Sequence, residues 1–331
     1  MKRINYLLLG ILFVFAIVIT SCNKEENDPI DEAQVLAEYL ESANSPLMKD
    51  YVNTDLPSIM AASEVKTLNE TGQVYIMDIR SVTDFAAGHI ANAHNVALVD
   101  ALSHIKGVDL TPYTKVAIVC YTGQTSGYVA SLLRLMGYDK VFSMKWGMCS
   151  WNEVFAGKWN TAIANGNAYA TQFVTTETAK AAKGELPVLS TGKTTGQEIL
   201  EARVAELLTA GFTPATITNQ AVFNDLSANY IVNYWSTAHY AIGHIPGAVQ
   251  YTPKETMKLA ADLKTLPTNK PIVVYCYTGQ TSAFLSAYLR LLGYDAKSLL
   301  YGTNGMIYDI MVANSMTVFK ADQIMGYAYV Q

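Results

Sequence analysis

Two cysteines of this chain, Cys120 and Cys276, each begin the same sequence, Cys-Tyr-Thr-Gly-Gln-Thr. In both places an apolar run typical of a buried strand ends at the cysteine, and a helical pattern follows from Ser126 or Ser282. A loop so short must curl, so its amide groups and the helix N-terminus can point at the sulfur. Such a loop would favour the thiolate, which is the nucleophilic form of cysteine, and would hold a persulfide by the same amides.

The residues of these loops are therefore candidates for binding an anion at the sulfur. Thr125 and Ser126 can add hydroxyl donors, and Gly123 allows a backbone shape that a side chain would obstruct. The candidate loop residues are Tyr121, Thr122, Gly123, Gln124, Thr125 and Ser126 in the first copy, and Tyr277, Thr278, Gly279, Gln280, Thr281 and Ser282 in the second.

The sequence around the loops is duplicated. Residues 120–139 and 276–295 are identical at 13 of 20 positions, and Gly88-His89-Ile90 recurs as Gly243-His244-Ile245. Each copy has the order strand, tight loop, helix, strand, with apolar strands that suit a sheet buried on both faces. We therefore expect an α/β fold of two tandem domains, each with a central parallel sheet flanked by helices.

The chain has 331 residues, enough for about two domains. We place the first domain at residues 33–160 and the second at 196–331. Residues 161–195, which are mostly small and polar, form the expected linker.

Composition excludes several other classes of protein. Half of the residues are hydrophobic and the net charge is −5, which argues against disorder and against a nucleic-acid partner. Four cysteines are too few for a disulfide scaffold, and the five histidines lack zinc-site spacing. We expect no metal and no cofactor.

The N-terminal sequence is typical of an export signal. Lys2 and Arg3 precede an apolar stretch that is too short to span a bilayer, and Ile19-Thr20-Ser21-Cys22 resembles a bacterial lipobox. We expect residues 1–21 to be a lipoprotein signal peptide, Cys22 to carry the lipid, and residues 22–32 to form a tether. The protein would then lie in the cell envelope, anchored to the lipid bilayer and facing the periplasm or the cell surface. An uncleaved signal anchor is the alternative.

Further motifs of the first copy carry a resemblance to a known family. Asp78-Ile79-Arg80, Asp84-Phe85, Gly88-His89-Ile90 and the strand-ending Cys120 loop together resemble the rhodanese (sulfurtransferase) family. The resemblance covers residues 55–160 and again 210–325. It implies a cysteine that takes sulfane sulfur from a small-molecule donor as a persulfide and passes it to a thiophilic acceptor.

By this resemblance Cys120 and Cys276 are the catalytic nucleophiles, while Asp78 and Arg80 support the loop. The related phosphatases use a longer loop that ends in arginine, and neither loop here contains Arg or Lys. Phosphatase activity is therefore not expected. The same absence leaves an organic persulfide as plausible a donor as thiosulfate.

The second copy departs from the family pattern, with Asn233 and Trp235 in place of Asp78 and Arg80. Two interpretations stay open: both loops are competent, or the second copy is structural. A rival function is a non-catalytic binding module of the envelope, although the sequence identifies no protein partner. Cys149 is either a small buried residue or a resolving thiol that could form a disulfide with Cys120.

Overall fold

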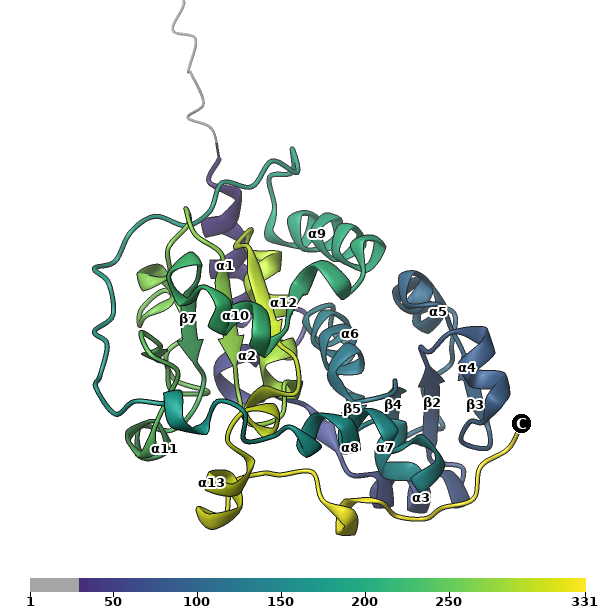
Figure 1. The fold of residues 1–331 in the computed structure, drawn as a ribbon. Helices are drawn as coiled ribbons and strands as arrows, with labels where there is room; N and C mark the ends of the chain where they lie inside the picture. The colour runs from purple at the N-terminus through teal and green to yellow at the C-terminus, as the bar shows by residue number, and fades with distance from the viewer. Residues whose placement is uncertain (1–29) are drawn as a thin grey trace, which may run out of the picture. The chain divides into compact units, whose positions relative to one another are not determined.

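A computed structural model describes residues 30–331, of which residues 31–331 form one compact unit (Figure 1). The expected signal peptide, the lipidation residue Cys22 and most of the tether lie outside the described residues. Within the described part of the chain, no helix is both long enough and apolar enough to cross a membrane.

Two five-stranded sheets form the framework of this unit, and every strand pair in both is parallel. The first sheet has the order β1 (Ile59–Met60), β5 (Val141–Met144), β4 (Lys115–Val119), β2 (Val74–Asp78), β3 (Ala93–Asn95). The second has the order β6 (Thr216–Ile217), β10 (Ala296–Leu299), β9 (Ile272–Tyr275), β7 (Tyr230–Asn233), β8 (Val249–Gln250). Because the two orders correspond strand by strand, the expected pair of α/β domains is confirmed.

Helices flank both sheets. In and before the first copy they are α1 (Glu32–Glu41), α2 (Tyr51–Thr54), α3 (Ala62–Glu70), α4 (Val82–Ala87), α5 (Ala101–Lys106), α6 (Gln124–Leu135), α7 (Met148–Trp151) and α8 (Gly157–Ala164). In the second they are α9 (Gly196–Ala210), α10 (Asn219–Asn224), α11 (Thr237–Ile242), α12 (Gln280–Leu291) and α13 (Tyr308–Ala313). Short 3-10 turns lie at Leu98–Asp100, Glu153–Phe155, Ala170–Gln172, Thr213–Ala215, Leu226–Ala228, Leu263–Thr265, Gly302–Gly305 and Ala321–Gln323.

The central strands and the helices that follow them form where the sequence pattern places them. Residues 116–119 of β4 are completely buried, as expected for a strand covered by helices on both faces. The helices α6 and α12 begin two residues earlier than the pattern predicts. Gly123 and Gly279 adopt left-handed conformations, with φ of 82° and 74°, and turn the chain into the helix at once.

Helices α6 and α12 pack directly against each other between the two sheets (Figure 1). The Ser131 hydroxyl of α6 donates a hydrogen bond to the Phe284 carbonyl of α12 over 2.9 Å. Nearer the helix starts, Gly123 lies against Gln280. Because both contacts occur in the same order along the two helices, the helices run parallel, and the two cysteine loops lie at the same end.

Each copy is also bound to a segment from the far end of the chain. Helix α1 packs on α9, where the Tyr39 hydroxyl donates to the Gln197 side-chain oxygen over 2.6 Å. The C-terminal segment returns to the first sheet's side (Figure 1), where Val330 forms an antiparallel bridge with His89. The boundaries expected from sequence place α1 in the first domain and this segment in the second. Their contacts reach into the opposite copy.

The packing of α6 against α12 predicts how one substitution affects stability. A side chain at Gly127 would place its Cβ 3.1 Å from the Phe284 ring and 3.2 Å from the Gln280 carbonyl. Gly127→Leu should therefore lower the free energy of unfolding by about 1–3 kcal/mol through overpacking, measured by urea denaturation. The control is Gly157→Ala on α8, where nothing lies within 4 Å of the added Cβ. An equal loss in both variants would contradict the expectation.

Candidate active site

The Cys120 sulfur lies inside its loop and is held by backbone amides. The amides of Gly123 and Ser126 donate to Sγ over 3.2 Å and 3.3 Å, and the Ser126 hydroxyl oxygen is 3.3 Å from it. The Ser126 hydroxyl in turn lies 2.7 Å from the hydroxyl of Ser143 on β5. Cys120 is only 4% exposed. These donors could stabilise negative charge on the sulfur.

A tight turn after β5 supports this loop from outside. Gly147 has φ of 59°, and a Cβ there would lie 2.4 Å from the Cys120 carbonyl oxygen, so a side chain would collide with backbone. The approach lets the Met148 amide donate to the Cys120 carbonyl over 2.9 Å and the Cys149 amide to the Tyr121 carbonyl over 3.1 Å. Sequence reasoning did not identify Gly147 as a site residue.

The second loop repeats this geometry with fewer donors to the sulfur. The Ser282 amide donates to Cys276 Sγ over 3.3 Å, and the Ser282 hydroxyl oxygen lies 3.6 Å away. Gly302 takes the place of Gly147, with φ of 53° and a Cβ position 2.3 Å from the Cys276 carbonyl oxygen. Cys276 is 1% exposed. Of the two sulfurs, Cys120 therefore has the better-formed set of amide donors.

The remaining loop residues divide between the loop interior and the contact between the copies. The Gln124 amide group donates to the Thr122 hydroxyl over 3.1 Å, and its oxygen accepts from the Tyr301 amide of the second copy over 2.8 Å. Gln280 lies against Gly123 in the reciprocal position. Thr125 forms no hydrogen bond to the sulfur among the residues the structure describes. Of the two expected hydroxyl groups, that of Ser126 lies within hydrogen-bond distance of the sulfur.

In the first copy a buried ion pair lies behind the loop. Arg80 Nη2 is 2.6 Å from Asp78 Oδ2, Arg80 Nε donates to Asp78 Oδ1 over 2.9 Å, and both side chains are almost fully buried. Arg80 Nη2 also donates to the Gly88 carbonyl over 2.8 Å. The guanidinium carbon lies 5.3 Å from the centre of the Tyr121 ring. The ion pair of Asp78 and Arg80, which the sequence predicted to support the loop, thus lies next to Tyr121, the residue that follows Cys120.

In the second copy Trp235 and His239 contact the loop tyrosine, Tyr277. The Trp235 ring stacks on Tyr277 at a centroid distance of 5.0 Å and an interplanar angle of 10°. His239 Nδ1 lies 2.5 Å from the Tyr277 hydroxyl. The Asn233 amide group donates to the Tyr275 hydroxyl over 2.7 Å. Burial raises the pKa of Tyr277 to about 12, so its phenol stays neutral.

The histidines of the Gly-His-Ile segments point at backbone groups. His89 Nδ1 lies 2.9 Å from the Phe85 carbonyl oxygen. The two ring nitrogens of His244 lie 3.0 Å and 2.9 Å from the carbonyl oxygens of Tyr240 and Thr176. These contacts fix the two turns. Within residues 30–331 no group of acidic, histidine or cysteine side chains could hold a metal ion.

Cys149 is fully buried beside the first loop, and its thiol donates to the Phe155 carbonyl over 3.1 Å. Burial raises the pKa of the Cys149 thiol to about 12. All three described cysteines are free. A resolving thiol must ionise to attack, so this environment disfavours that role, which stays a prediction for Cys149.

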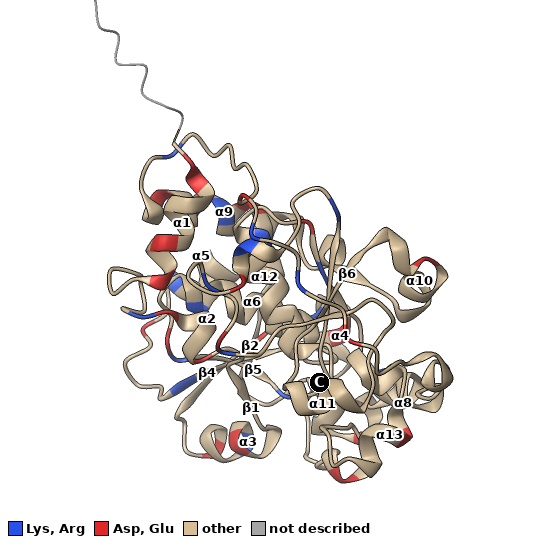
Figure 2. Cartoon of the chain, turned by 90° about the vertical axis from the view of Figure 1, so that its left-hand side faces the viewer, with Lys and Arg blue, Asp and Glu red and all other residues tan. Residues whose placement is uncertain are grey.

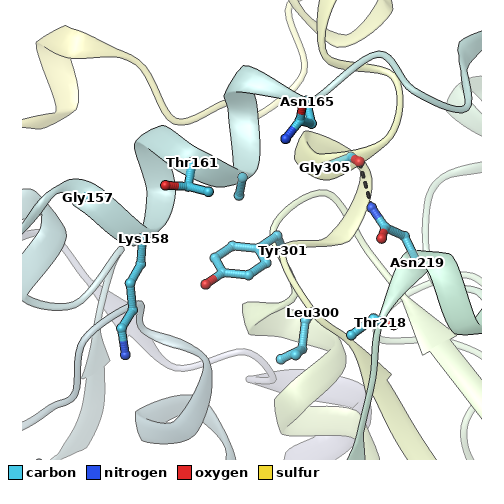
Figure 3. Close-up of a pocket in the computed structure, with 10 residues that line it drawn as sticks. Gly157, Lys158, Thr161, Asn165, Thr218, Asn219, Leu300, Tyr301 and Gly305 are labelled. Atoms are coloured by element: carbon cyan, nitrogen blue, oxygen red, sulfur yellow. Dashed lines mark hydrogen bonds between the residues drawn. The ribbon is translucent and has the colours of Figure 1, made fainter.

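A cavity of about 590 Å³ adjoins the Cys120 loop, and sequence reasoning missed it (Figure 3). Residues of α8, of the start of α10 and of the turn after β10 line it. Its charged residue, Lys158, lies 4.2 Å from the centre of the Tyr121 ring. The neighbouring Trp159 donates its indole N–H to the Thr122 carbonyl over 3.1 Å, which fixes α8 against the loop.

Comparison with known proteins identifies the family of this chain. The model of the rhodanese-like domain matches residues 61–154 and 222–306. The chain belongs to the rhodanese-like family. Each match contains one of the two cysteine loops, so the family was correctly recognised from the sequence motifs.

Curated relatives in this family are sulfurtransferases. The thiosulfate sulfurtransferase GlpE of Pseudomonas fluorescens is 32% identical over 103 residues, which cover 31% of this chain and 88% of the relative. That of Tolumonas auensis is 30% identical over 96 residues, covering 29% and 89%. The structure of Escherichia coli SseA, described as a 3-mercaptopyruvate sulfotransferase, covers 75% of this chain and 98% of its own at 14% identity and a TM-score of 0.27. The curated relatives support sulfur transfer as the general chemistry of this rhodanese-like chain.

The buried ion pair gives a test of how the first loop is supported. Arg80→Met leaves the Asp78 carboxylate buried without a counter-charge and should lower the free energy of unfolding by about 3–5 kcal/mol. The double variant Asp78→Asn/Arg80→Trp copies the uncharged arrangement of the second copy and should recover at least half of that loss. Urea denaturation measures both. A double variant as unstable as the single one would contradict this account.

The Cys149 environment predicts its reactivity. Because a thiol with a pKa of about 12 is ionised at pH 8 to about one part in 10⁴, iodoacetamide should leave Cys149 unmodified in the folded protein. Peptide mass spectrometry should find the modified residue only after unfolding in urea. Rapid modification at pH 8, or a Cys120–Cys149 disulfide after mild oxidation, would instead support the resolving role.

Proposed function

We propose that this chain is a sulfurtransferase that carries sulfane sulfur on Cys120 as a persulfide. The observation that carries the proposal is the position of Cys120 Sγ, which accepts hydrogen bonds from the amides of Gly123 and Ser126 at the start of α6. Amide donors at a helix N-terminus stabilise an anionic sulfur without a neighbouring base. The sulfurtransferase relatives support the same chemistry.

The reaction would take two half-reactions. In the first, the Cys120 thiolate attacks the sulfane sulfur of the donor, a sulfur–sulfur bond forms, and the leaving group departs with the electron pair of the broken bond. In the second, a nucleophilic acceptor attacks the outer sulfur and the Cys120 thiolate leaves. Cyanide serves as the acceptor in an assay, and a thiol or sulfite would serve in the cell.

The two copies would differ in competence, with the first more active. Cys120 accepts two amide hydrogen bonds and Cys276 accepts one, and only the first copy has the Asp78–Arg80 ion pair behind its loop. A weaker set of donors holds an anionic sulfur less well. Cys276 would therefore form its persulfide more slowly than Cys120.

The rival function, a binding module in which the cysteines are incidental, has one observation in its favour. Both sulfurs are nearly inaccessible, with Cys120 4% and Cys276 1% exposed. The two functions differ in one measurable respect, because a binding module forms no persulfide with any donor. In either case we propose an envelope protein anchored through lipid on Cys22.

Substitution of each cysteine tests the proposal. Cys120→Ser should lower sulfur transfer from a donor to cyanide at least about 100-fold, because the nucleophile is lost. Cys276→Ser should retain more than half of the activity, and Cys149→Ser serves as the control for a buried thiol beside the loop. Mass spectrometry after donor treatment should find one added sulfur on the Cys120 peptide.

Three outcomes would count against the proposal. Full activity in Cys120→Ser would assign the reaction to another residue. Greater loss in Cys276→Ser than in Cys120→Ser would reverse the ranking of the copies. Absence of a persulfide on either peptide with every donor tried would favour the binding module.

A further inference from the structure

Each copy sends an arm, a chain segment that follows its last α-helix, onto the other copy. The first arm, residues 166–174, follows α8 of the first copy and contacts the second copy. The second arm, residues 319–330, follows α13 of the second copy and returns to the first copy (Figure 1). The two arms are therefore exchanged between the copies.

Each arm forms a backbone hydrogen bond beside the turn that supports the cysteine loop. The Tyr169 amide donates to the Met306 carbonyl over 3.3 Å, and the Met325 amide donates to the Ser150 carbonyl over 2.9 Å. Met325 lies as far after Tyr169 as Met306 lies after Ser150, which is also the spacing of the two cysteines. The arms therefore dock at equivalent places of the two copies.

The end of each arm docks on the Gly-His-Ile segment of the other copy. Val330 and His89 exchange two backbone hydrogen bonds of 2.8 Å and 2.9 Å. Val174 and His244 exchange two hydrogen bonds of 2.9 Å. An aromatic residue precedes the valine in both arms. Because the same contact occurs in both copies, the Gly-His-Ile segments are the docking sites of the arms.

The docking parts of both arms are uncharged. Residues 166–174 and 323–331 contain no acidic or basic side chain. Acidic and basic residues gather around α1 and α9, and few lie around α8 and α11 (Figure 2). Docking therefore depends on backbone hydrogen bonds and on aromatic packing, which salt does not screen.

The second arm binds α7, the short helix that holds the Cys120 loop. The Tyr327 amide donates to the Trp151 carbonyl over 2.9 Å, and the Trp151 indole N–H donates to the Ala328 carbonyl over 2.8 Å. At the other end of α7, its first two amides donate to the carbonyls of residues 120 and 121. One face of this helix thus contacts the loop, and its last residue is fixed by the arm.

Two further side chains of the second arm hold the turn before α7. Phe319 is fully buried, and its ring packs edge-on against Trp146 at a centroid distance of 5.4 Å. Gln323 Oε1 accepts a hydrogen bond from the Trp146 indole N–H over 3.0 Å. Trp146 directly precedes Gly147, which approaches the Cys120 carbonyl closely. The arm therefore fixes the turn that this approach requires.

Tyr329 connects the second arm with the buried ion pair. A Cβ at Gly88 would lie 2.8 Å from the Tyr329 ring, and this ring packs edge-on against Phe155 at a centroid distance of 5.0 Å. The Gly88 carbonyl accepts from Arg80 Nη2 over 2.8 Å, and the Arg80 guanidinium lies beside Tyr121. The arm thus contacts both supports of the first loop, α7 and the ion pair.

From these contacts we infer that the second arm is a positioning element for the Cys120 loop, so that the reactivity of Cys120 depends on the second copy of the domain. The inference rests on the proposed function. The amides that hold the sulfur are directed by the loop backbone, and hydrogen bonds weaken steeply when their angles change. Both arms lie outside the residues that the rhodanese-like model matches, so this support is additional to the domain itself.

A substitution in the second arm tests the inference on the full chain. Tyr329→Ala should lower the limiting rate of Cys120 persulfide formation about fivefold and leave the half-saturating donor concentration within about twofold, because the arm positions the loop and binds no donor. The pH midpoint of this rate should rise by about half a unit, because misdirected amides stabilise the thiolate less. Tyr329→Phe, which keeps the ring, should restore the wild-type values.

The first arm supplies the matched control. Phe173→Ala removes the equivalent ring from the docking site of the second copy and should leave the Cys120 rate within about twofold. Thiosulfate and methanethiosulfonate serve as donors, and peptide mass spectrometry follows Cys120. Urea denaturation of each variant measures its stability.

A second variant reports on the turn before α7 instead of the Gly-His-Ile segment. Gln323→Ala removes the acceptor of the Trp146 indole N–H and should lower the limiting rate about threefold, with the same upward change of the pH midpoint. Gln323→Glu keeps an oxygen acceptor and should retain more of the rate than Gln323→Ala.

The outcomes separate this inference from the proposed function. If the wild-type protein forms no Cys120 persulfide with either donor, the proposed function fails. If persulfide forms but Tyr329→Ala and Gln323→Ala keep the wild-type rate and pH midpoint, the arm does not position the loop and this inference is overturned. Equal slowing by Phe173→Ala and Tyr329→Ala would indicate a general loss of stability and would overturn it as well.

Discussion

The packing of α6 against α12 is the constraint on which the rest of this structure depends. Each helix begins at the cysteine loop of its copy, so the parallel contact between them brings the two loops to one end of the pair. The small residue Gly127 allows the close approach at Phe284. Gly123 and Gly279 each lie directly before the first residue of their helix and turn the chain into it. The position of both sulfurs thus follows from one helix–helix contact and two left-handed glycines.

Both cysteine sulfurs have little access to solvent in this arrangement. Each loop contacts the other copy, and both cysteines are almost fully buried. In the structure Gln124 of one loop accepts from Tyr301 of the other copy, so the wall of each site is partly built by its neighbour. A sulfur buried in this way offers little surface to molecules in the solvent. Burial therefore bears on which donors can react, not only on stability.

The two copies show that one loop shape can be supported in two ways. In the first, Arg80 is paired with Asp78 and lies against Tyr121, which introduces a cation about 5.3 Å from the loop tyrosine. In the second, Trp235 stacks on Tyr277 and supplies no charge. Both arrangements hold the tyrosine that follows the cysteine. Only the first places a buried ion pair behind the loop.

Local sequence by itself determined the duplicated α/β order, the two cysteine loops, and the strand and helix that hold each one. These features depend on the apolar period and on glycine positions within about twenty residues, so a reader of the sequence can find them. The sequence pattern placed the starts of α6 and α12 two residues too late. The reason is that the left-handed backbone conformation of Gly123 and Gly279 cannot be predicted from composition. The roles of Thr125 and Cys149 likewise could not be judged without their surroundings.

Only the tertiary structure decided the rest. The contact of Gln124 with Tyr301, the packing of α1 on α9 and the return of Val330 to His89 all join residues more than 150 positions apart. Lys158 belongs to no recognisable sequence motif. It lies next to the Cys120 loop because the neighbouring Trp159 donates a hydrogen bond to the Thr122 carbonyl. Sequence patterns report neighbours along the chain, whereas a site between two copies is made by contacts that only folding brings together.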